Sequence, residues 1–139
     1  MNVIFRSALG VMLAASLAAC LGAPATEVSA EDRVAERAVA RWEALIAGDW
    51  QGAYAMLTPG YRAATPFERW RGQFGGAVAW KSVSVQGIIC AEQDVCRATL
   101  LLDYEVSIPR PGIQKWPGRR PVEETWLLLD GEWWFHPER

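Results

Sequence analysis

Residues 121–139, PVEETWLLLDGEWWFHPER, decide the fold of this chain. Two apolar, tryptophan-rich runs flank the dipeptide Asp130-Gly131. A type I′ turn requires positive φ at both central residues, and Asp and Gly tolerate that conformation best. The stretch therefore predicts a tight antiparallel hairpin. Its large aromatic side chains should make it the platform on which the earlier helices pack, and they are Trp126, Trp133, Trp134 and Phe135.

Three helices are predicted ahead of the sheet. Apolar residues recur at helical spacing over residues 31–47, and a glycine follows them. A capping aspartate starts a second helix over residues 50–57, which the segment Thr58-Pro59-Gly60 would break. A third helix, residues 66–74, begins with a capping-box pattern whose N-cap is Thr65.

After these helices the apolar pattern changes to a period of two. Residues 80–90 and 96–108 predict two antiparallel strands joined by a short loop, in which Asp94 takes the left-handed conformation. Strict pairing outward from the loop places the apolar residues of the two strands on opposite faces. A one-residue bulge at Gly87 brings them to one face, and glycine inside a strand often marks a bulge. We therefore predict a bent first strand.

Residues 108–121 contain four prolines, so they are predicted to form a long loop and not a central strand. Two arrangements are open for it. Trp116, Arg119 and Arg120 form a contact patch with an outward-facing Trp134, or the loop folds back over Trp134. A third hypothesis is contact with anionic lipid headgroups through the loop's basic residues, which are Arg110, Lys115, Arg119 and Arg120.

The N-terminus has the pattern of a secretory signal. Residues 1–19 contain one basic residue and then an apolar run too short to span a bilayer comfortably. The tetrapeptide Leu17-Ala18-Ala19-Cys20 that ends this run resembles the bacterial lipobox, in which the cysteine is diacylated and becomes the first mature residue. Several acyl chains would hold the protein on a membrane permanently. The alternative is an ordinary signal peptide, with Cys20 as a free thiol.

The mature chain is expected to be short and to contain one domain. Residues 20–30 predict a lipidated cysteine with a flexible tether, and residues 31–139 a single domain. The resemblance to the lipobox implies a place in the cell envelope. In an organism with two membranes, Leu21 after the cysteine favours the outer membrane, facing the periplasm.

Charge and cysteine content exclude several classes of partner. The chain has 14 basic and 16 acidic residues, and loss of the signal, which contains Arg6, leaves 13 against 16. This balance argues against nucleic acid as a partner. Cys90 and Cys96 should pair as a disulfide in an oxidising compartment. With only His136 in addition, they fall short of the four ligands of structural zinc, so we expect neither a metal nor a cofactor.

Two segments carry a family resemblance. Residues 41–62, RWEALIAGDWQGAYAMLTPGYR, and residues 124–135, ETWLLLDGEWWF, resemble the opening and the closing hairpin of nuclear-transport-factor-two-like domains (SnoaL-like, or cystatin-like cones). The resemblance covers roughly residues 31–137. It implies an α+β cone: three N-terminal helices packed on a curved, mostly antiparallel four-stranded sheet. The superfamily contains isomerases, dehydratases and cyclases, and also noncatalytic binding domains.

Two functions are compatible with these patterns. The first is a noncatalytic, lipid-anchored envelope domain that binds a partner protein, an envelope polymer or a small apolar ligand. The alternative is a small isomerase or dehydratase with Glu124 as base, in an acid-base cluster with Tyr54 and Tyr104 inside the cone. The competing interpretation of these three residues is a rim salt bridge of Glu124 beneath two packed tyrosines, since no second inward carboxylate or inward histidine accompanies them. His136 should be exposed at the end of the last strand.

Overall fold

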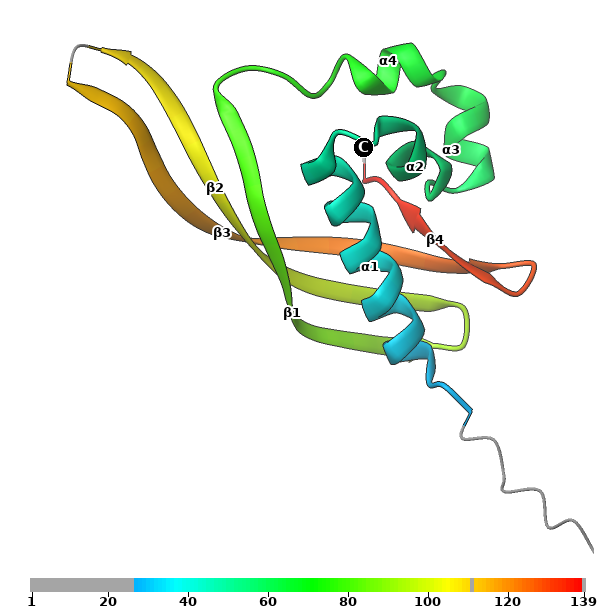
Figure 1. Cartoon of the computed structure of the whole chain (residues 1–139). Helices are drawn as coiled ribbons and strands as arrows, with labels where there is room; N and C mark the ends of the chain where they lie inside the picture. The colour runs from blue at the N-terminus through cyan, green and yellow to red at the C-terminus, as the bar shows by residue number, and fades with distance from the viewer. Residues whose placement is uncertain (1–26, 111, 139) are drawn as a thin grey trace, which may run out of the picture.

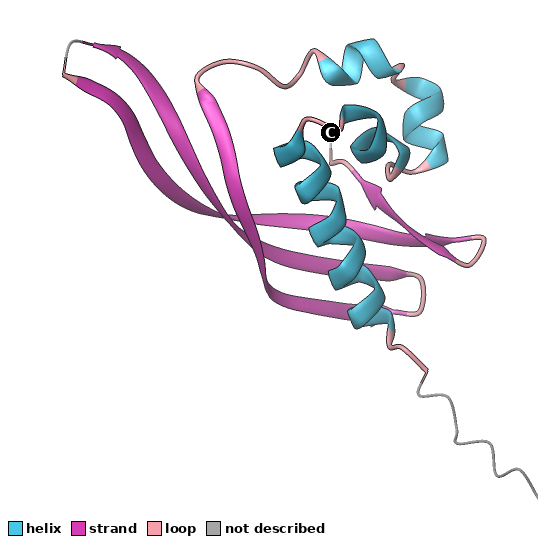
Figure 2. Ribbon diagram, viewed as in Figure 1, coloured by secondary structure: helices cyan, strands magenta, loops and turns pink. Residues whose placement is uncertain are grey.

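A computed structural model describes residues 27–110 and 112–138. Figures 1 and 2 show four helices on one face of a curved antiparallel sheet with strand order β1-β2-β3-β4, which confirms the predicted α+β class. The elements are α1 (Ala30–Ala47), α2 (Trp50–Ala55), α3 (Pro59–Ala64), α4 (Phe67–Arg71), β1 (Val78–Glu92), β2 (Val95–Arg110), β3 (Ile113–Leu129) and β4 (Glu132–His136).

The predicted signal peptide, Cys20 and most of the predicted tether lie outside the described residues. The tether prediction also extends slightly too far, because α1 already begins at Ala30, where the Ser29 side chain accepts a hydrogen bond from the Asp32 N–H. None of the helices in the described ranges is long and apolar enough to cross a membrane.

The described chain has four helices where the sequence predicted three. The segment predicted as a break starts α3 instead, because the Thr58 hydroxyl caps the Tyr61 N–H and Pro59 occupies the first turn. Thr65 then ends this helix, and its own N–H donates to the Tyr61 carbonyl. The predicted capping box is therefore wrong: α4 begins after Pro66 with no side-chain cap.

The bulge predicted in the first strand is confirmed. Val85 pairs with Leu100 and Gly87 pairs with Thr99, so the ladder shifts by one residue between them. The register also shifts after Trp80 and after Ile89. These irregularities bend β1 and put its apolar residues on the same face as the buried leucines of β2.

The disulfide between Cys90 and Cys96 is formed and joins β1 to β2 next to their turn. It closes a short loop, which stabilises the fold by about 2 kcal/mol in the chain-entropy account. The predicted left-handed Asp94 is wrong, since Asp130 is the single non-glycine residue with positive φ among those described. Glu92 pairs with Val95, so a two-residue turn suffices.

The prediction of a loop over residues 108–121 is wrong. Most of this segment extends β2 and β3 into a long hairpin that projects beyond the helices (Figure 1). Prolines are tolerated here because β4 pairs only with residues 125–129, which leaves the outer half of β3 with an open edge. Pro117 and Pro121 are four residues apart, so both ring nitrogens face the same edge.

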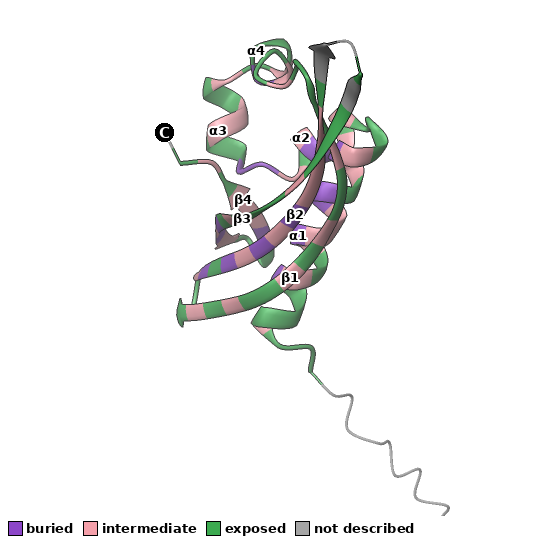
Figure 3. Ribbon diagram, turned by 90° about the vertical axis from the view of Figure 1, so that its left-hand side faces the viewer, coloured by how far each residue is buried: buried purple, intermediate pink, exposed green. Residues whose placement is uncertain are grey.

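The C-terminal hairpin is the predicted platform. Asp130 and Gly131 have φ of 51° and 81°, as a type I′ turn requires. Trp126 is fully buried and Trp133 is 3% exposed. The outer edge of β4 hydrogen-bonds to the segment between α2 and α3, where Phe135 accepts from the Thr58 N–H at 2.9 Å. Figure 3 shows buried residues alternating with more exposed ones along β2, as a sheet with one covered face requires.

Candidate functional site

The centre of the sheet carries a buried polar cluster around Glu124. This side chain is 3% exposed and lies on the face of β3 that α1 covers. Its Oε1 accepts hydrogen bonds from the Arg41 guanidinium and from Trp42 Nε1 at 2.7 Å. Its Oε2 accepts from Trp126 Nε1 at 3.0 Å. Arg41 also lies over the Phe135 ring, with Cζ 3.9 Å from the ring centroid. Both carboxylate oxygens are therefore occupied by protein donors.

This cluster connects α1 to the sheet. Arg41 is 4% exposed, and its burial lowers the pKa of the guanidinium, while the charge and hydrogen bond of Glu124 oppose that shift. A buried ion needs a partner and further hydrogen bonds to offset its lost hydration. Glu124 has both, which gives it a structural role.

The predicted acid-base cluster is not assembled. The Tyr54 hydroxyl donates to the Thr65 carbonyl at 2.8 Å, in the segment that follows α3. Tyr104 pairs with Gly118, which is six residues from Glu124 on β3. Six residues of strand span about 20 Å. The structure therefore places the two tyrosines and the carboxylate in three separate environments.

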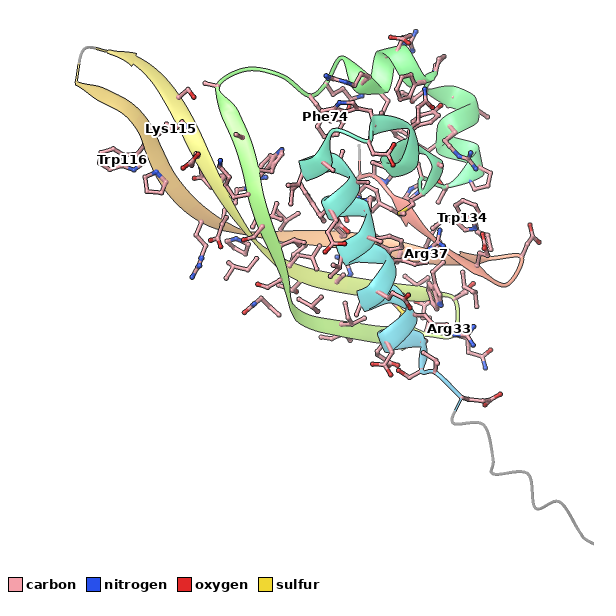
Figure 4. The ribbon with its side chains drawn as sticks, viewed as in Figure 1. Arg33, Arg37, Phe74, Lys115, Trp116 and Trp134 are labelled. Atoms are coloured by element: carbon pink, nitrogen blue, oxygen red, sulfur yellow. A yellow bond between two sulfur atoms is a disulfide. The ribbon has the colours of Figure 1, made fainter. Side chains whose placement is uncertain are left out.

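A hollow of about 320 Å³ lies between α2, the end of α4 with the segment that follows it, and strands β1 and β3. We call it the mouth and define it by the rings of Trp50, Phe74 and Trp80 and the guanidinium groups of Arg71 and Arg120. Figure 4 shows Phe74 on the segment that follows α4. Among the described residues that line the mouth, none is acidic.

The rings and cations of the mouth contact one another. The centroids of Trp50 and Phe74 are 5.4 Å apart. Arg71 lies over Trp50 with Cζ 3.8 Å from the ring centroid, and its Nη1 donates to the Phe74 carbonyl at 3.0 Å. Arg120 lies 5.7 Å from the centroid of Trp80. Weakly hydrated guanidinium groups beside aromatic faces suit a ligand that combines an anionic group with an apolar body.

The predicted patch of Trp116 and Trp134 is not formed. Figure 4 shows these two tryptophans at opposite ends of the sheet, with Trp116 on the projecting hairpin. Trp134 is half-buried and donates from Nε1 to the Leu129 carbonyl at 3.3 Å. The alternative prediction, that residues 108–121 cover Trp134, is not met either. Arg37 and Arg62, from α1 and α3, lie 5.5 and 5.4 Å from its ring centroid.

Arg119 and Arg120, predicted as partners in one patch, lie on opposite faces of β3. Arg119 donates to Asp103 at 2.5 and 3.2 Å, which raises the pKa of the guanidinium and lowers that of the carboxyl. Arg120 pairs with Leu102 on the helix-covered face and reaches Trp80. Of the two arginines, only Arg120 belongs to the mouth.

A larger hollow, of about 790 Å³, lies elsewhere in the described part of the chain, between α3 and the β3–β4 hairpin. It contains the single histidine, His136, which is exposed as predicted and whose Nδ1 is 3.4 Å from Thr58 Oγ1. Its other lining residues are mostly small or aliphatic, with one ring from Tyr61 and one carboxylate from Glu138. The smaller mouth concentrates three rings and two cations, so its lining is chemically more selective.

The described residues contain no group of three or more His, Cys, Asp or Glu side chains placed to hold a metal ion. The mouth has no cysteine, serine or histidine among its described lining residues. What this lining offers a small molecule is stacking surface and positive charge.

The fold defines the protein as an α+β domain with helices packed against one curved antiparallel sheet. No protein-family model matches the sequence, and the search of curated proteins finds no match. The structure is similar to that of a SEC-C motif containing protein from Rhodopseudomonas palustris, with 11% identity, a TM-score of 0.52 and 70% of each chain covered. It is also similar to a candidate polyketide cyclase from Xanthomonas campestris, with 13% identity, a TM-score of 0.42 and coverage of 79% of this chain and 93% of that one. The first similarity supports the fold alone, and the second is too low to carry an argument.

Proposed function

We propose that this chain is a noncatalytic binding domain whose mouth takes a small apolar ligand that carries a negative charge. The carrying observation is the convergence of three aromatic rings and two guanidinium groups on one hollow without an acidic neighbour among the described lining residues. Its volume of about 320 Å³ falls in the range of small-molecule sites, about 300–1,000 Å³. A small molecule therefore fits this hollow better than a protein partner does.

The state of Glu124 favours binding over the alternative of an isomerase or dehydratase. A general base needs an oxygen within hydrogen-bonding reach of the substrate proton. Both oxygens of Glu124 already accept hydrogen bonds from Arg41, Trp42 and Trp126. The carboxylate is also 3% exposed, so a substrate would have to displace α1 to reach it.

Replacing Arg120 with Gln is expected to weaken binding of 8-anilinonaphthalene-1-sulfonate about tenfold, the loss of about 1.4 kcal/mol of charge-assisted contact. Binding is measured by fluorescence titration of the purified domain. The matched control is Arg119→Gln, which removes the same charge from the opposite face of β3 and should leave the affinity unchanged. Uncharged N-phenyl-1-naphthylamine should bind the wild type and Arg120→Gln equally.

Two outcomes contradict the proposal. One is the absence of saturable sulfonate binding to the folded wild type. The other is an equal loss in Arg119→Gln and Arg120→Gln, which would assign the effect to net charge and not to the mouth. Near-ultraviolet circular dichroism of each variant checks that the fold is retained, because partly unfolded chains also bind this dye.

The domain is further proposed to be held in the cell envelope by lipid on Cys20, facing the periplasm from the outer membrane in an organism with two membranes. The lipobox-like Leu17-Ala18-Ala19-Cys20 supports this proposal. The disulfide between Cys90 and Cys96 fits an oxidising compartment. Residues 21–29 separate the proposed lipid from α1, a reach of about 30 Å at most.

Cys20→Ser should move the protein from the membrane fraction to the soluble fraction, because a stable anchor requires more than one acyl chain and all of the proposed chains depend on this thiol. The measurement is fractionation of expressing cells with immunoblotting, together with the mass of the N-terminal peptide. Ser29→Ala, in the same region, is the control and should stay membrane-bound. A wild-type protein that is found only in the soluble fraction would end this part of the proposal.

The hypothesis that the basic hairpin binds lipid headgroups is less well supported. Figure 1 shows the start of α1 and the far part of the β2–β3 hairpin at opposite ends of the domain, so the hairpin lies far from the attachment point of the proposed tether. Lys115 lies 3.8 Å from Glu105, and Arg119 is paired with Asp103. The side chain of Arg110 is outside the described part.

A further inference from the structure

The projecting hairpin carries a row of apolar side chains on one face. In the β-ladder, Val78 pairs with Val106 and Val106 pairs with Trp116, so the three side chains lie side by side across β1, β2 and β3. We call these residues the apolar row. Val78 is 42% exposed and Trp116 is 59% exposed. A contiguous exposed apolar patch of this kind marks a binding surface more often than scattered apolar residues do.

The apolar row continues into the mouth. Two residues along each strand, the next rung on the same face is Trp80, Tyr104 and Gly118, with the rings of Trp80 and Tyr104 6.0 Å apart. A Cβ at Gly118 would collide with the Tyr104 ring, so the glycine lets that ring lie flat across β3. Arg120 follows two residues later. From Arg120 to Trp116 the strand spans about 13 Å.

The opposite face of the same hairpin is polar. Its side chains form the pairs Lys81–Glu105 at 2.7 Å and Lys115–Glu105 at 3.8 Å, and the pair of Arg119 with Asp103. Among the described residues of the hairpin, the ion pairs therefore lie on one face, and the apolar row lies on the face that leads to the mouth. The face that carries the apolar row therefore has a cationic, aromatic end at the mouth and an apolar end at Trp116.

We infer that the ligand of the mouth is a single-chain anionic amphiphile, whose head contacts Arg71 and Arg120 and whose alkyl chain lies over the Trp80–Tyr104 rung and the apolar row. This inference rests on the proposed function and extends it to a ligand class. It commits to an amphiphile because the surface is positive at one end and apolar at the other. A second copy of this chain would bind here only if it placed acidic side chains against the guanidinium groups of the mouth and apolar side chains against the apolar row.

The inference is tested with the series hexanoate, octanoate, decanoate and dodecanoate, each below its micelle concentration, by tryptophan fluorescence and calorimetry. Affinity should rise about fourfold per methylene, since each buried methylene adds about 0.8 kcal/mol of binding free energy, until the chain extends past Trp116. In Trp116→Ser this gain should disappear for decanoate and dodecanoate, whereas hexanoate binding should not change. Lys115→Ser, on the polar face of the same strand, is the matched control and should behave as wild type.

The outcomes separate this inference from the function it rests on. If wild type binds hexanoate and the sulfonate dye but shows no chain-length dependence, or if Trp116→Ser retains the dependence, the chain does not lie on the apolar row and only the inference falls. If the wild type binds neither hexanoate nor the sulfonate dye, the proposed function itself is wrong. A dimer that Trp116→Ser abolishes in analytical ultracentrifugation, without any chain-length dependence, assigns the row to a second copy and overturns the inference.

Discussion

Replacing Glu124 with alanine is expected to lower the free energy of unfolding by about 3–5 kcal/mol. The substitution leaves the Arg41 guanidinium, 4% exposed, without its counter-charge. It also leaves the indole N–H groups of Trp42 and Trp126 without their acceptor. These unpaired donors are part of the expected loss, because a buried donor without a partner costs about 1–3 kcal/mol. Urea unfolding followed by far-ultraviolet circular dichroism measures the loss.

Two further variants make the result specific. Glu123→Ala removes the preceding carboxylate, which is exposed, and should change stability by no more than about 0.5 kcal/mol. The double variant Arg41→Met with Glu124→Leu removes both charges and should be more stable than Glu124→Ala alone, because no ion then remains unpaired. If Glu124→Ala unfolds within about 1 kcal/mol of wild type, the cluster is not what holds α1 to the sheet. That result would favour the alternative function, in which the Glu124 carboxylate acts as a general base.

Local sequence patterns sufficed where the responsible chemistry is local. The hairpin at Asp130-Gly131 follows from the positive φ that its turn requires. The bulge beside Gly87 follows from the need to place the apolar residues of two paired strands on one face. Both features are decided by residues close in sequence or by a simple alternation, so the sequence alone predicts them.

The outer part of β3 could not be predicted from its own sequence, because its tolerance for proline depends on β4, which is a separate element. Residues 113–121 can hold Pro117 and Pro121 only because β4 is too short to pair with this part of β3. The length of β4 is determined by residues outside this segment, so the segment alone does not indicate that its edge is open. The extra helix α3 was missed for another reason: Thr-Pro occurs twice, and only the first, at Thr58, is an N-cap.

The residues of the mouth come together only through tertiary contacts. Trp50, Phe74 and Trp80 belong to three different segments, and no local pattern indicates that they meet. The sequence of α1 does contain an indication that Glu124 has a buried partner. Arg41 occupies the helical spacing of the buried face of α1, with Ala38 and Leu45 on the same stripe, and a charge on a buried stripe implies a buried partner.

Trp126→Ala is expected to cost about 3–5 kcal/mol of unfolding free energy, the usual effect of deleting a fully buried tryptophan. The side chain packs against Phe135 at a centroid distance of 5.9 Å and donates to Glu124. Domains of this size have a total stability of about 5–15 kcal/mol, so this variant should unfold at much lower urea. Trp126→Phe keeps most of the buried area but loses the donor, and should cost about 1–3 kcal/mol.

Trp116→Ala, at an exposed position of the same strand, is the control and should change stability by no more than about 0.5 kcal/mol. Equal losses at Trp126 and Trp116 would contradict the burial order of β3, and with it the docking of α1 on this face of the sheet.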